Sequence, residues 1–382
     1  METRKKICFI VSEPVTAQAF LKDHILALAR EFDVYLVANL SGGKQIRISG
    51  LKTVHHVKIE RGINIAADIK SVRKLISYFK KEKFDAVHSV TPKAGLVTAL
   101  AAKLAGLENR IHIFTGQVWA TKTGAMRILL KSMDKLISAC DNHILVDGES
   151  QRKFLISEGV ISAKQSKVLG AGSICGADIE RFTPAQTERD SQRKALGISD
   201  NKVVYSFMGR LNRDKGIYEL LEAFNDMLPE APDAYLILFG SDEENCQSHF
   251  NEYPNIIPGV NFTYFGPTST PQLSLQVSDV FCLPSYREGF GLSVIEASCL
   301  GLPVICSDAY GLADTMVDNE TGLRSKVKDS KTLKQAMNYF YNNPDDRKRM
   351  GEAGRSRVLN LFSGESIVKE WVEFYKKLLK AQ

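Results

Sequence analysis

The strongest constraint on the fold is an alternation of short apolar runs with helical patterns, which occurs twice along the chain. In the first half, strand-like runs begin at residues 6–11 and 33–38 and recur up to 167–169, with helical patterns between most of them. Past residue 200 the alternation restarts at 203–208. Strands that alternate with helices predict a doubly wound parallel sheet. We therefore expect an α/β protein with two Rossmann-like parallel-sheet domains.

The segment between the two alternations predicts a linker. Residues 171–184 show no clear period and contain glycine and proline. A chain of 382 residues is comfortable for two domains. The expected division is a first domain over residues 1–172, a linker over 173–185, a second domain over 186–360 and a final helix over 361–382.

A glycine-rich turn follows the predicted strand at 279–283. Residues 287–297 read REGFGLSVIEA, with a predicted helix from Leu292. Glycine lets the backbone approach a ligand closely, and free N–H groups at a helix start hold an anion. Glu288 and Glu296 flank this turn, and an ionised carboxylate accepts hydrogen bonds from hydroxyl groups. The turn thus predicts a ligand with both phosphate and hydroxyl groups, such as a nucleotide sugar.

A second turn, MGRLNRDKG at 208–216, follows the first strand of the second half. Arg210 is suited to fork onto two phosphate oxygens, whereas Lys215 acts as a mobile point charge. Together they predict a diphosphate site that needs no metal. The chain has no Walker A motif, and no Gly-x-Gly-x-x-Gly follows its first strand. These absences exclude a P-loop nucleotidase and weaken the case for a dinucleotide oxidoreductase.

Both turns resemble the motifs of one enzyme family. EGFGLSVIEA at 288–297 resembles the Glu-x7-Glu signature of retaining glycosyltransferases of the GT-B fold, family 4, and GRLNRDKG at 209–216 resembles their Gly-Arg-Leu-x-x-x-Lys-Gly motif. The resemblance implies two domains facing across a cleft, with the final helix crossing back to the first domain. It also implies a nucleotide diphosphate sugar as donor, UDP in preference to GDP, and transfer with retention.

The resemblance assigns roles to the residues of the two turns. Glu288 is expected to bind sugar hydroxyls near the reacting carbon, and Glu296 to bind the ribose hydroxyls. The segments 239–241 and 265–267 are expected to frame the base. The expected catalytic residues are Glu288, Arg210 and Lys215, and the expected donor-binding residues are Gly209, Arg210, Lys215, Glu288, Gly289, Phe290, Gly291, Leu292 and Glu296.

The first half is expected to hold the acceptor. HSVTPKAG at 88–95 resembles a run in the bacterial surface-polysaccharide branch of the family, which implies a lipid-linked glycan acceptor in surface polysaccharide or O-antigen biosynthesis. Thr91 and Lys93 lie in this strand-to-helix turn, and Thr115 and Gln117 follow the next strand. These four residues are the expected acceptor side. Gln117 is suited to bind a sugar hydroxyl but not to act as a base.

Charge is distributed unevenly. Residues 1–185 carry 28 Lys and Arg against 17 Asp and Glu, a net +11, and the rest of the chain carries −5, which gives the total of +6. A basic half attracts acidic lipid headgroups or nucleic acid. Its aromatic residues lie mostly inside apolar runs, which disfavours nucleic acid. The stretch 122–135 places Met126, Leu129, Leu130 and Met133 on one face, so it either lies on an anionic membrane or packs as an ordinary amphipathic helix.

The remaining features limit location and cofactors. The first apolar run is too short for a signal peptide, and no run of about 18 apolar residues spans a membrane. The seven scattered cysteines indicate a reducing compartment, and no cluster has metal-ligand spacing. We expect a cytoplasmic enzyme without metal or other cofactor, peripheral on the cytoplasmic face of the inner membrane. The alternatives are a nucleotide-sugar epimerase or hydrolase of the same fold, and a protein that only binds anionic lipid or nucleic acid.

Overall fold

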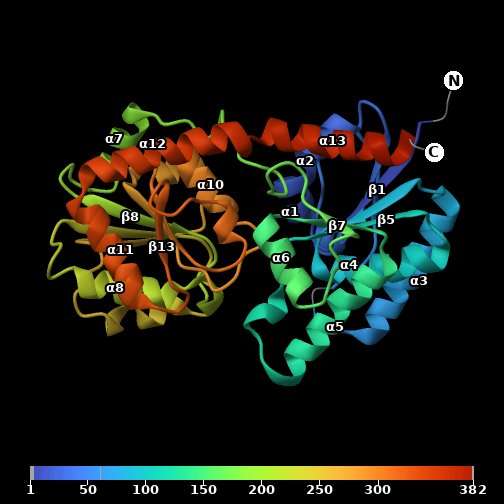
Figure 1. Ribbon diagram of the computed structural model, residues 1–382, viewed down its shortest axis with the longest axis horizontal. Coiled ribbons are helices and arrows are strands. Elements are labelled where there is room, and N and C mark those ends of the chain that lie inside the picture. The colour runs from blue at the N-terminus through green and yellow to red at the C-terminus, as the bar shows by residue number, and fades with distance from the viewer. Residues whose placement is uncertain (1–3, 61, 381–382) are drawn as a thin grey trace. The chain divides into compact units, whose positions relative to one another are not determined.

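The computed structural model describes residues 4–60 and 62–380, and the chain divides into two compact units (Figure 1). Unit 1 comprises Met1–Cys175 together with Gly364–Gln382, and unit 2 comprises Gly176–Ser363. Each unit is built on one parallel sheet covered by helices on both faces. The predicted fold class, two doubly wound α/β domains, is therefore confirmed.

Unit 1 contains a seven-stranded sheet in the order β3-β2-β1-β4-β5-β6-β7, and all pairs of neighbouring strands are parallel. The residues of the edge strand β3 are partly exposed and form no continuous apolar run. The strands are β1 Lys6–Ile10, β2 Asp33–Ala38, β3 Leu51–His56, β4 Ala86–Ser89, β5 Asn109–Phe114, β6 His143–Val146 and β7 Ser166–Lys167.

Helices cover both faces of this sheet. Alternate residues of β1 point to opposite sides, so Phe9 packs with α2 and α13, whereas Cys8 packs with α3 and α4. After β1 the chain forms α1, a π-helical turn at Ala17–Leu21, and α2 in direct succession. The helices are α1 Pro14–Thr16, α2 Lys22–Leu28, α3 Ile65–Glu82, α4 Pro92–Ala105, α5 Gly124–Cys140, α6 Glu149–Ser157 and α13 Gly364–Lys380.

Helix α13 is held in unit 1 by a stack of buried rings. Trp371 lies between His24 and His88, with ring centroids 4.1 Å and 5.0 Å away. His88 Nδ1 is 2.7 Å from the Tyr375 hydroxyl, and His24 Nε2 donates to the Ile174 carbonyl at 2.7 Å. Burial lowers the pKa of His24 to about 4 and that of His88 well below its usual value. Both rings are therefore neutral and stack as apolar groups.

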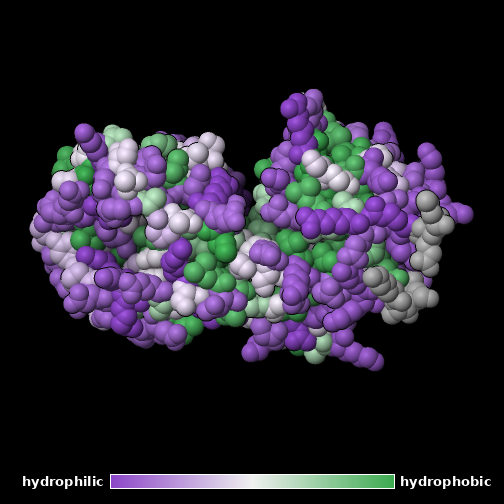
Figure 2. Space-filling view, turned by 90° about the horizontal axis from the view of Figure 1, so that it is seen from above, coloured by the Kyte–Doolittle hydropathy of each residue, from purple (hydrophilic) through white to green (hydrophobic). Residues whose placement is uncertain are grey.

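Unit 2 contains a six-stranded parallel sheet in the order β10-β9-β8-β11-β12-β13. The strands are β8 Val203–Met208, β9 Ala234–Phe239, β10 Phe262–Gly266, β11 Val280–Leu283, β12 Val304–Ser307 and β13 Gly322–Ser325. The helices are α7 Gln186–Ala195, α8 Ile217–Met227, α9 Pro271–Ser274, α10 Leu292–Cys299, α11 Ser330–Asn342 and α12 Pro344–Leu361. On the face seen in Figure 2, hydrophilic side chains prevail and hydrophobic ones form smaller patches.

Each sheet has one point at which the strand order reverses. In unit 1 it lies between β1 and β4, and in unit 2 between β8 and β11. Crevices outside the carboxyl ends of the strands at such a point are where open α/β sheets bind ligands. The two predicted motif turns, after β8 and after β11, both lie at the reversal point of unit 2.

Candidate functional site

The turn after β8 is tightly held by glycines. The Gly209 N–H donates to the Phe239 carbonyl at 3.0 Å, and a Cβ at Gly240 would lie 1.7 Å from the Gly209 oxygen. Asn212 caps a 3₁₀ turn, Arg213–Lys215, and Gly216 then begins α8 at φ +71°. A Cβ at Gly216 would lie 2.1 Å from the Pro284 oxygen. Only glycine allows the turn after β8 to approach the turn after β11 this closely.

The two turns are also bonded to each other through Asp214. Its carboxylate accepts from Arg287 Nε at 3.0 Å, and its carbonyl accepts from the Tyr286 N–H at 2.8 Å. Arg287 therefore forms a salt bridge between the turns. The two motifs, more than 70 residues apart in sequence, form one structural element at the end of the sheet.

Lys215 and Glu288 are brought together as an ion pair between these turns. Their side chains are only 19% and 13% exposed, and the Ser285 hydroxyl donates to Glu288 at 2.8 Å. Arg210 has a different partner: it is 55% exposed and pairs with Glu243 at 3.0 Å. Glu243 also accepts from Asn212 at 3.0 Å. Glu243 was not predicted as a site residue. Its position in the acidic run at 242–244, shortly after β9, could have indicated it.

The glycine-rich turn offers backbone rather than side chains. The Phe290 ring is buried against Phe362, with centroids 5.2 Å apart, and Gly291 caps α10 at φ +85°. A Cβ at Gly311 would lie 2.5 Å from the backbone carbonyl oxygen of Glu288, so the loop that contains Gly311 packs closely against the turn. Helix α10 begins at Leu292, and the first N–H groups of a helix have no partner within the helix. These groups are suited to hold an anion.

Glu296 lies on α10, partly buried. Burial raises its pKa to about 7, Arg181 opposes this shift and Asp178 adds to it. Arg181 is held by Gln272, to which its Nε donates at 2.9 Å, and its own N–H donates to Asp178 at 3.0 Å. Both residues come from the segment that the sequence analysis assigned to the linker. That segment therefore sets the charge environment of the second predicted carboxylate.

The predicted base-framing segments lie side by side at the ends of β9 and β10. The Gly240 N–H donates to the Gly266 carbonyl at 2.8 Å, and the Tyr264 hydroxyl donates to the Gly240 carbonyl at 2.8 Å. The rings of Phe239 and Phe265 are 5.5 Å apart, and Phe265 is exposed. An exposed ring at this edge provides an apolar surface next to the turn after β8.

In unit 1, the predicted acceptor-side residues lie at the carboxyl ends of β4 and β5. Thr91 precedes α4, and its hydroxyl is 2.9 Å from that of Ser12, across the reversal point between β1 and β4. Lys93 is largely buried and pairs with Asp68 at 2.5 Å. Thr115 is partly exposed, whereas Gln117 is only 1% exposed and accepts from Gln151 at 3.2 Å. Gln117 therefore lies inside the unit.

Two buried carboxyl groups near these residues were not foreseen. Asp147 follows β6, and its Oδ1 has no hydrogen-bond partner within the described part of the chain. Burial raises the pKa of Asp147 to about 8. Asp134 on α5 accepts from the Trp119 indole at 2.7 Å, and burial raises its pKa to about 7. The position of Asp147 at a strand end was a signal for it, but the hydrophobic pattern around Asp134 gave none.

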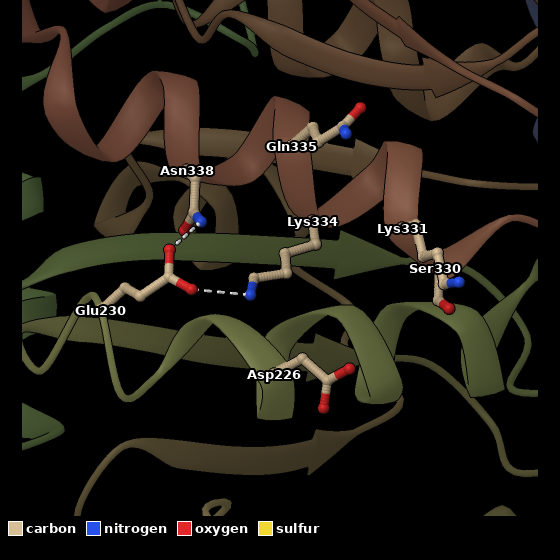
Figure 3. A pocket seen from close by; sticks show the side chains of 7 residues that line it. All are labelled: Asp226, Glu230, Ser330, Lys331, Lys334, Gln335 and Asn338. Carbon is tan, nitrogen blue, oxygen red and sulfur yellow. Dashed lines mark hydrogen bonds and ion pairs between the residues drawn. The ribbon is translucent and has the colours of Figure 1, made fainter.

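A polar hollow between α8 and α11 lies apart from the strand ends (Figure 3). Glu230 accepts there from Lys334 at 2.8 Å and from Asn338 at 2.9 Å. The residues around it are Asp226, Glu230, Ser330, Lys331, Lys334, Gln335 and Asn338. None of them belongs to the two motif turns, and Glu230 and Lys334 already pair with each other. We therefore place the candidate site at the motif turns.

Two further properties bear on the site. Within residues 4–60 and 62–380, no group of three or more His, Cys, Asp or Glu side chains is arranged to hold a metal ion. None of the helices in this described part has both the length and the apolar character needed to cross a bilayer.

Comparison with known proteins gives consistent matches in both halves. The family "Glycosyl transferases group 1" matches residues 188–357, and "Glycosyl transferase 4-like" matches residues 6–139. The chain is 31% identical over 351 residues to the "Capsular polysaccharide biosynthesis glycosyltransferase CapM" of Staphylococcus aureus, covering 92% of this chain and 91% of that protein.

Two other proteins extend these matches. The "UDP-Gal:alpha-D-GlcNAc-diphosphoundecaprenol alpha-1,3-galactosyltransferase" of Escherichia coli is 27% identical, with 78% of this chain and 77% of that protein covered. The structure of sucrose-phosphate synthase from Thermosynechococcus elongatus superposes with a TM-score of 0.83 at 22% identity, over 99% of this chain and 100% of that chain. This last likeness concerns the fold.

Proposed function

The chain belongs to the group 1 glycosyltransferases, retaining enzymes of family 4 with the GT-B fold, and from this premise we propose that it transfers a sugar from a UDP-sugar to a hydroxyl of a lipid-linked glycan. It is thus a nucleotide-sugar glycosyltransferase. This excludes the alternative that the protein only binds lipid or nucleic acid. The observation that carries the proposal is the junction of the two motif turns, where Lys215 meets Glu288.

The donor fits this junction by chemistry. The N–H groups of Gly289 to Leu292, together with Arg210 and Lys215, supply the positive side for a diphosphate. Glu288 accepts from the hydroxyls of the transferred sugar, and Glu296 accepts from those of the ribose. The exposed Phe265 lies where the base is expected to stack. UDP as the nucleotide is supported by the Escherichia coli relative, which is named as a UDP-Gal-dependent galactosyltransferase.

The reaction follows from charge. Breaking the anomeric C–O bond builds positive charge on the sugar and negative charge on the departing diphosphate. Lys215, Arg210 and the first N–H groups of α10 stabilise the negative charge that develops on the diphosphate. In the same-face attack commonly used to explain retention, the departing phosphate takes the proton of the acceptor hydroxyl. We propose that no metal takes part, because Arg210 and Lys215 supply positive charge to the diphosphate once it replaces their present partners, Glu243 and Glu288.

The acceptor side is proposed for unit 1, around Thr91, Lys93 and Thr115, whereas Gln117, which follows the same strand as Thr115, is buried inside the unit. Names of relatives support a lipid-linked glycan: the protein of Staphylococcus aureus acts in capsular polysaccharide biosynthesis, and that of Escherichia coli acts on a diphosphoundecaprenol-linked sugar. The excess of positive charge in residues 1–185 suits peripheral contact with an anionic membrane. We propose that the enzyme works at the cytoplasmic face of the inner membrane in the synthesis of a surface polysaccharide.

Calorimetric titration with UDP and GDP tests the donor site. We expect UDP to bind at micromolar strength, and Arg210→Ala and Glu296→Ala each to weaken binding by about 1–3 kcal/mol, the scale of a lost charged hydrogen bond. Arg213→Ala is the matched control, because Arg213 lies in the same turn but stacks over Tyr218 at 5.0 Å. Preference for GDP would correct the donor. Binding that is indifferent to Arg210 and Glu296 would refute the proposed site.

The affinity for UDP is expected to depend on pH through Glu296. Its pKa lies at about 7, so the carboxylate that accepts the ribose hydroxyls forms as the pH rises from 6 to 8. Over this range the ionised fraction increases about tenfold, and we expect UDP to bind about tenfold more tightly at pH 8. The control is Glu296→Gln, which cannot ionise and leaves the titration of the UDP phosphate unchanged. An equal pH dependence in both proteins would contradict the assignment.

A further inference from the structure

In the first half of α5, Arg127 and Lys131 turn inward while several apolar side chains turn outward. Arg127 and Lys131 both pair with Glu158 and lie over the Trp119 ring, with their charged atoms 5.2 Å and 5.5 Å from its centroid. On the outer side Ile128 is 68% exposed, and Met126 and Leu129 are also exposed. Ordinary core packing of an amphipathic helix describes the end of α5, where Ile137 and Cys140 are buried, but it does not describe the exposed apolar side chains of the first half.

Beside α5 lies a cavity of about 170 Å³ with predominantly apolar walls. The walls are formed by Ile63, Leu96, Val118, Trp119, Leu130 and Met133. Two charged residues also line it, but Lys93 is paired with Asp68 at 2.5 Å and Asp134 with the Trp119 indole at 2.7 Å. Since both already have a partner within the protein, the cavity matches an apolar occupant better than a polar one.

The cavity adjoins the acceptor side of unit 1. Pro92 and Lys93, which line it, directly follow Thr91 at the end of β4, and Val118 directly follows Gln117 beyond β5. Its lining residues Ile63 and Val118 are themselves exposed, so the cavity opens at an apolar rim. Next to it, Arg127 and Lys131 share a single carboxylate, Glu158, so these two cations have one counter-ion between them. An apolar cavity with a basic neighbourhood is complementary to a hydrocarbon chain that carries an anionic group.

We propose that this cavity holds the isoprenoid chain of the acceptor, at the units next to its diphosphate. The proposal rests on the proposed function, in which the acceptor is lipid-linked. Size agrees with it: an apolar cavity of about 150 Å³ accommodates a benzene molecule, so 170 Å³ accommodates about one or two five-carbon isoprene units. The chain beyond them then passes over the exposed apolar side chains of α5. The cavity thereby distinguishes a glycan on an isoprenoid carrier from the same glycan without one.

Titration of the full chain with farnesyl diphosphate and with inorganic diphosphate tests this directly. We expect farnesyl diphosphate to bind at least about tenfold more tightly and to change the fluorescence of Trp119, since the only other tryptophan, Trp371, lies on α13 and is buried in the core away from the cavity. Val118→Asp places a charge at the 42% exposed rim and is expected to abolish the preference. Leu104→Asp is the matched control, because Leu104 is 65% exposed at the far end of α4 and is expected to leave the preference unchanged.

A second variant guards against misfolding of the first. Met133→Ala enlarges the cavity without adding charge and is expected to weaken farnesyl diphosphate several-fold while leaving inorganic diphosphate unaffected. Equal affinity for the two diphosphates, or an unchanged preference in both variants, would overturn the proposal. So would a Val118-dependent dimer in light scattering that farnesyl diphosphate does not dissociate. Binding to phosphatidylglycerol vesicles that farnesyl diphosphate does not compete with would assign the surface to bulk lipid and also overturn it.

The two proposals fail separately. If UDP binds with the expected dependence on Arg210 and Glu296 but farnesyl diphosphate shows no preference, only the isoprenoid site is wrong. If UDP does not bind, the donor assignment and the proposed function are wrong, whatever the result with farnesyl diphosphate.

Discussion

Replacing Lys215 with methionine is expected to lower kcat/KM about a thousandfold. This is the scale of removing one preorganised hydrogen-bond donor from an active site. Methionine keeps most of the length and apolar surface of the side chain and removes only the charge. Lys215 is 19% exposed, so little water can replace its ammonium group. Without it, the developing charge on the diphosphate loses a partner and Glu288 is left as an unpaired carboxylate. Turnover is measured with the UDP-sugar and lipid extract that support the parent enzyme.

Arg213→Met serves as the control for this prediction. Arg213 lies in the same 3₁₀ turn, but its guanidinium stacks on Tyr218 instead of pairing across the two turns. We expect its kcat/KM to change less than about threefold. A loss below about tenfold for Lys215→Met, or equal losses in the two variants, would show that the Lys215–Glu288 pair has only a structural role.

Replacing Trp371 with alanine is expected to lower the free energy of unfolding of unit 1 by about 3–5 kcal/mol. The side chain is almost fully buried, and it stacks between His24 and His88 on the face of the sheet that α2 and α13 cover. Alanine leaves a cavity there and removes contacts that hold α13. Urea unfolding followed by circular dichroism and by Trp119 fluorescence measures the change in the unit that contains both tryptophans.

Glu373→Ala is the matched control on the same helix. The Glu373 side chain is 47% exposed and pairs with Lys376 at 3.6 Å on the same helix, so we expect a change within about 0.5 kcal/mol. Because the donor residues belong to unit 2, Trp371→Ala is also expected to retain UDP affinity at temperatures where unit 1 remains folded. A loss below about 1 kcal/mol would mean that α13 is held mainly by its other contacts.

The sequence could predict the fold and the positions of the two motif turns, because both depend on local patterns. Parallel strands buried on both faces appear as apolar runs, and glycines with charged residues directly after them mark the carboxyl ends of the sheet. That Lys215 and Glu288 approach each other follows from the adjacency of β8 and β11. Their direct pairing did not follow, because it depends on the close contact that Gly216 allows.

Other features depend on contacts that no local pattern records. The periodicity of α5 predicts that one face is apolar and another basic, but it does not tell which face packs against the protein. Glu158, which directly follows α6, pairs with Arg127 and Lys131 and so determines that these basic side chains face the protein. In the same way, His88 stood in an expected acceptor motif, yet its partner Tyr375 lies 287 residues further along the chain. Arg181 and Asp178 belonged to a predicted linker, and only the folded chain brings them to Glu296.

The ion pairs of the donor turns have a consequence for competition among cellular anions. Arg210 and Lys215 each hold a carboxylate, Glu243 and Glu288, so an incoming phosphate must displace an internal counter-ion. Inorganic phosphate or a plain polyphosphate gives nothing back to the displaced carboxylates. A ligand that brings sugar hydroxyls provides Glu288 with new hydrogen-bond donors in the same event. If the turns bind the donor as proposed, we expect them to select a phosphate group that arrives together with a sugar over a phosphate group alone.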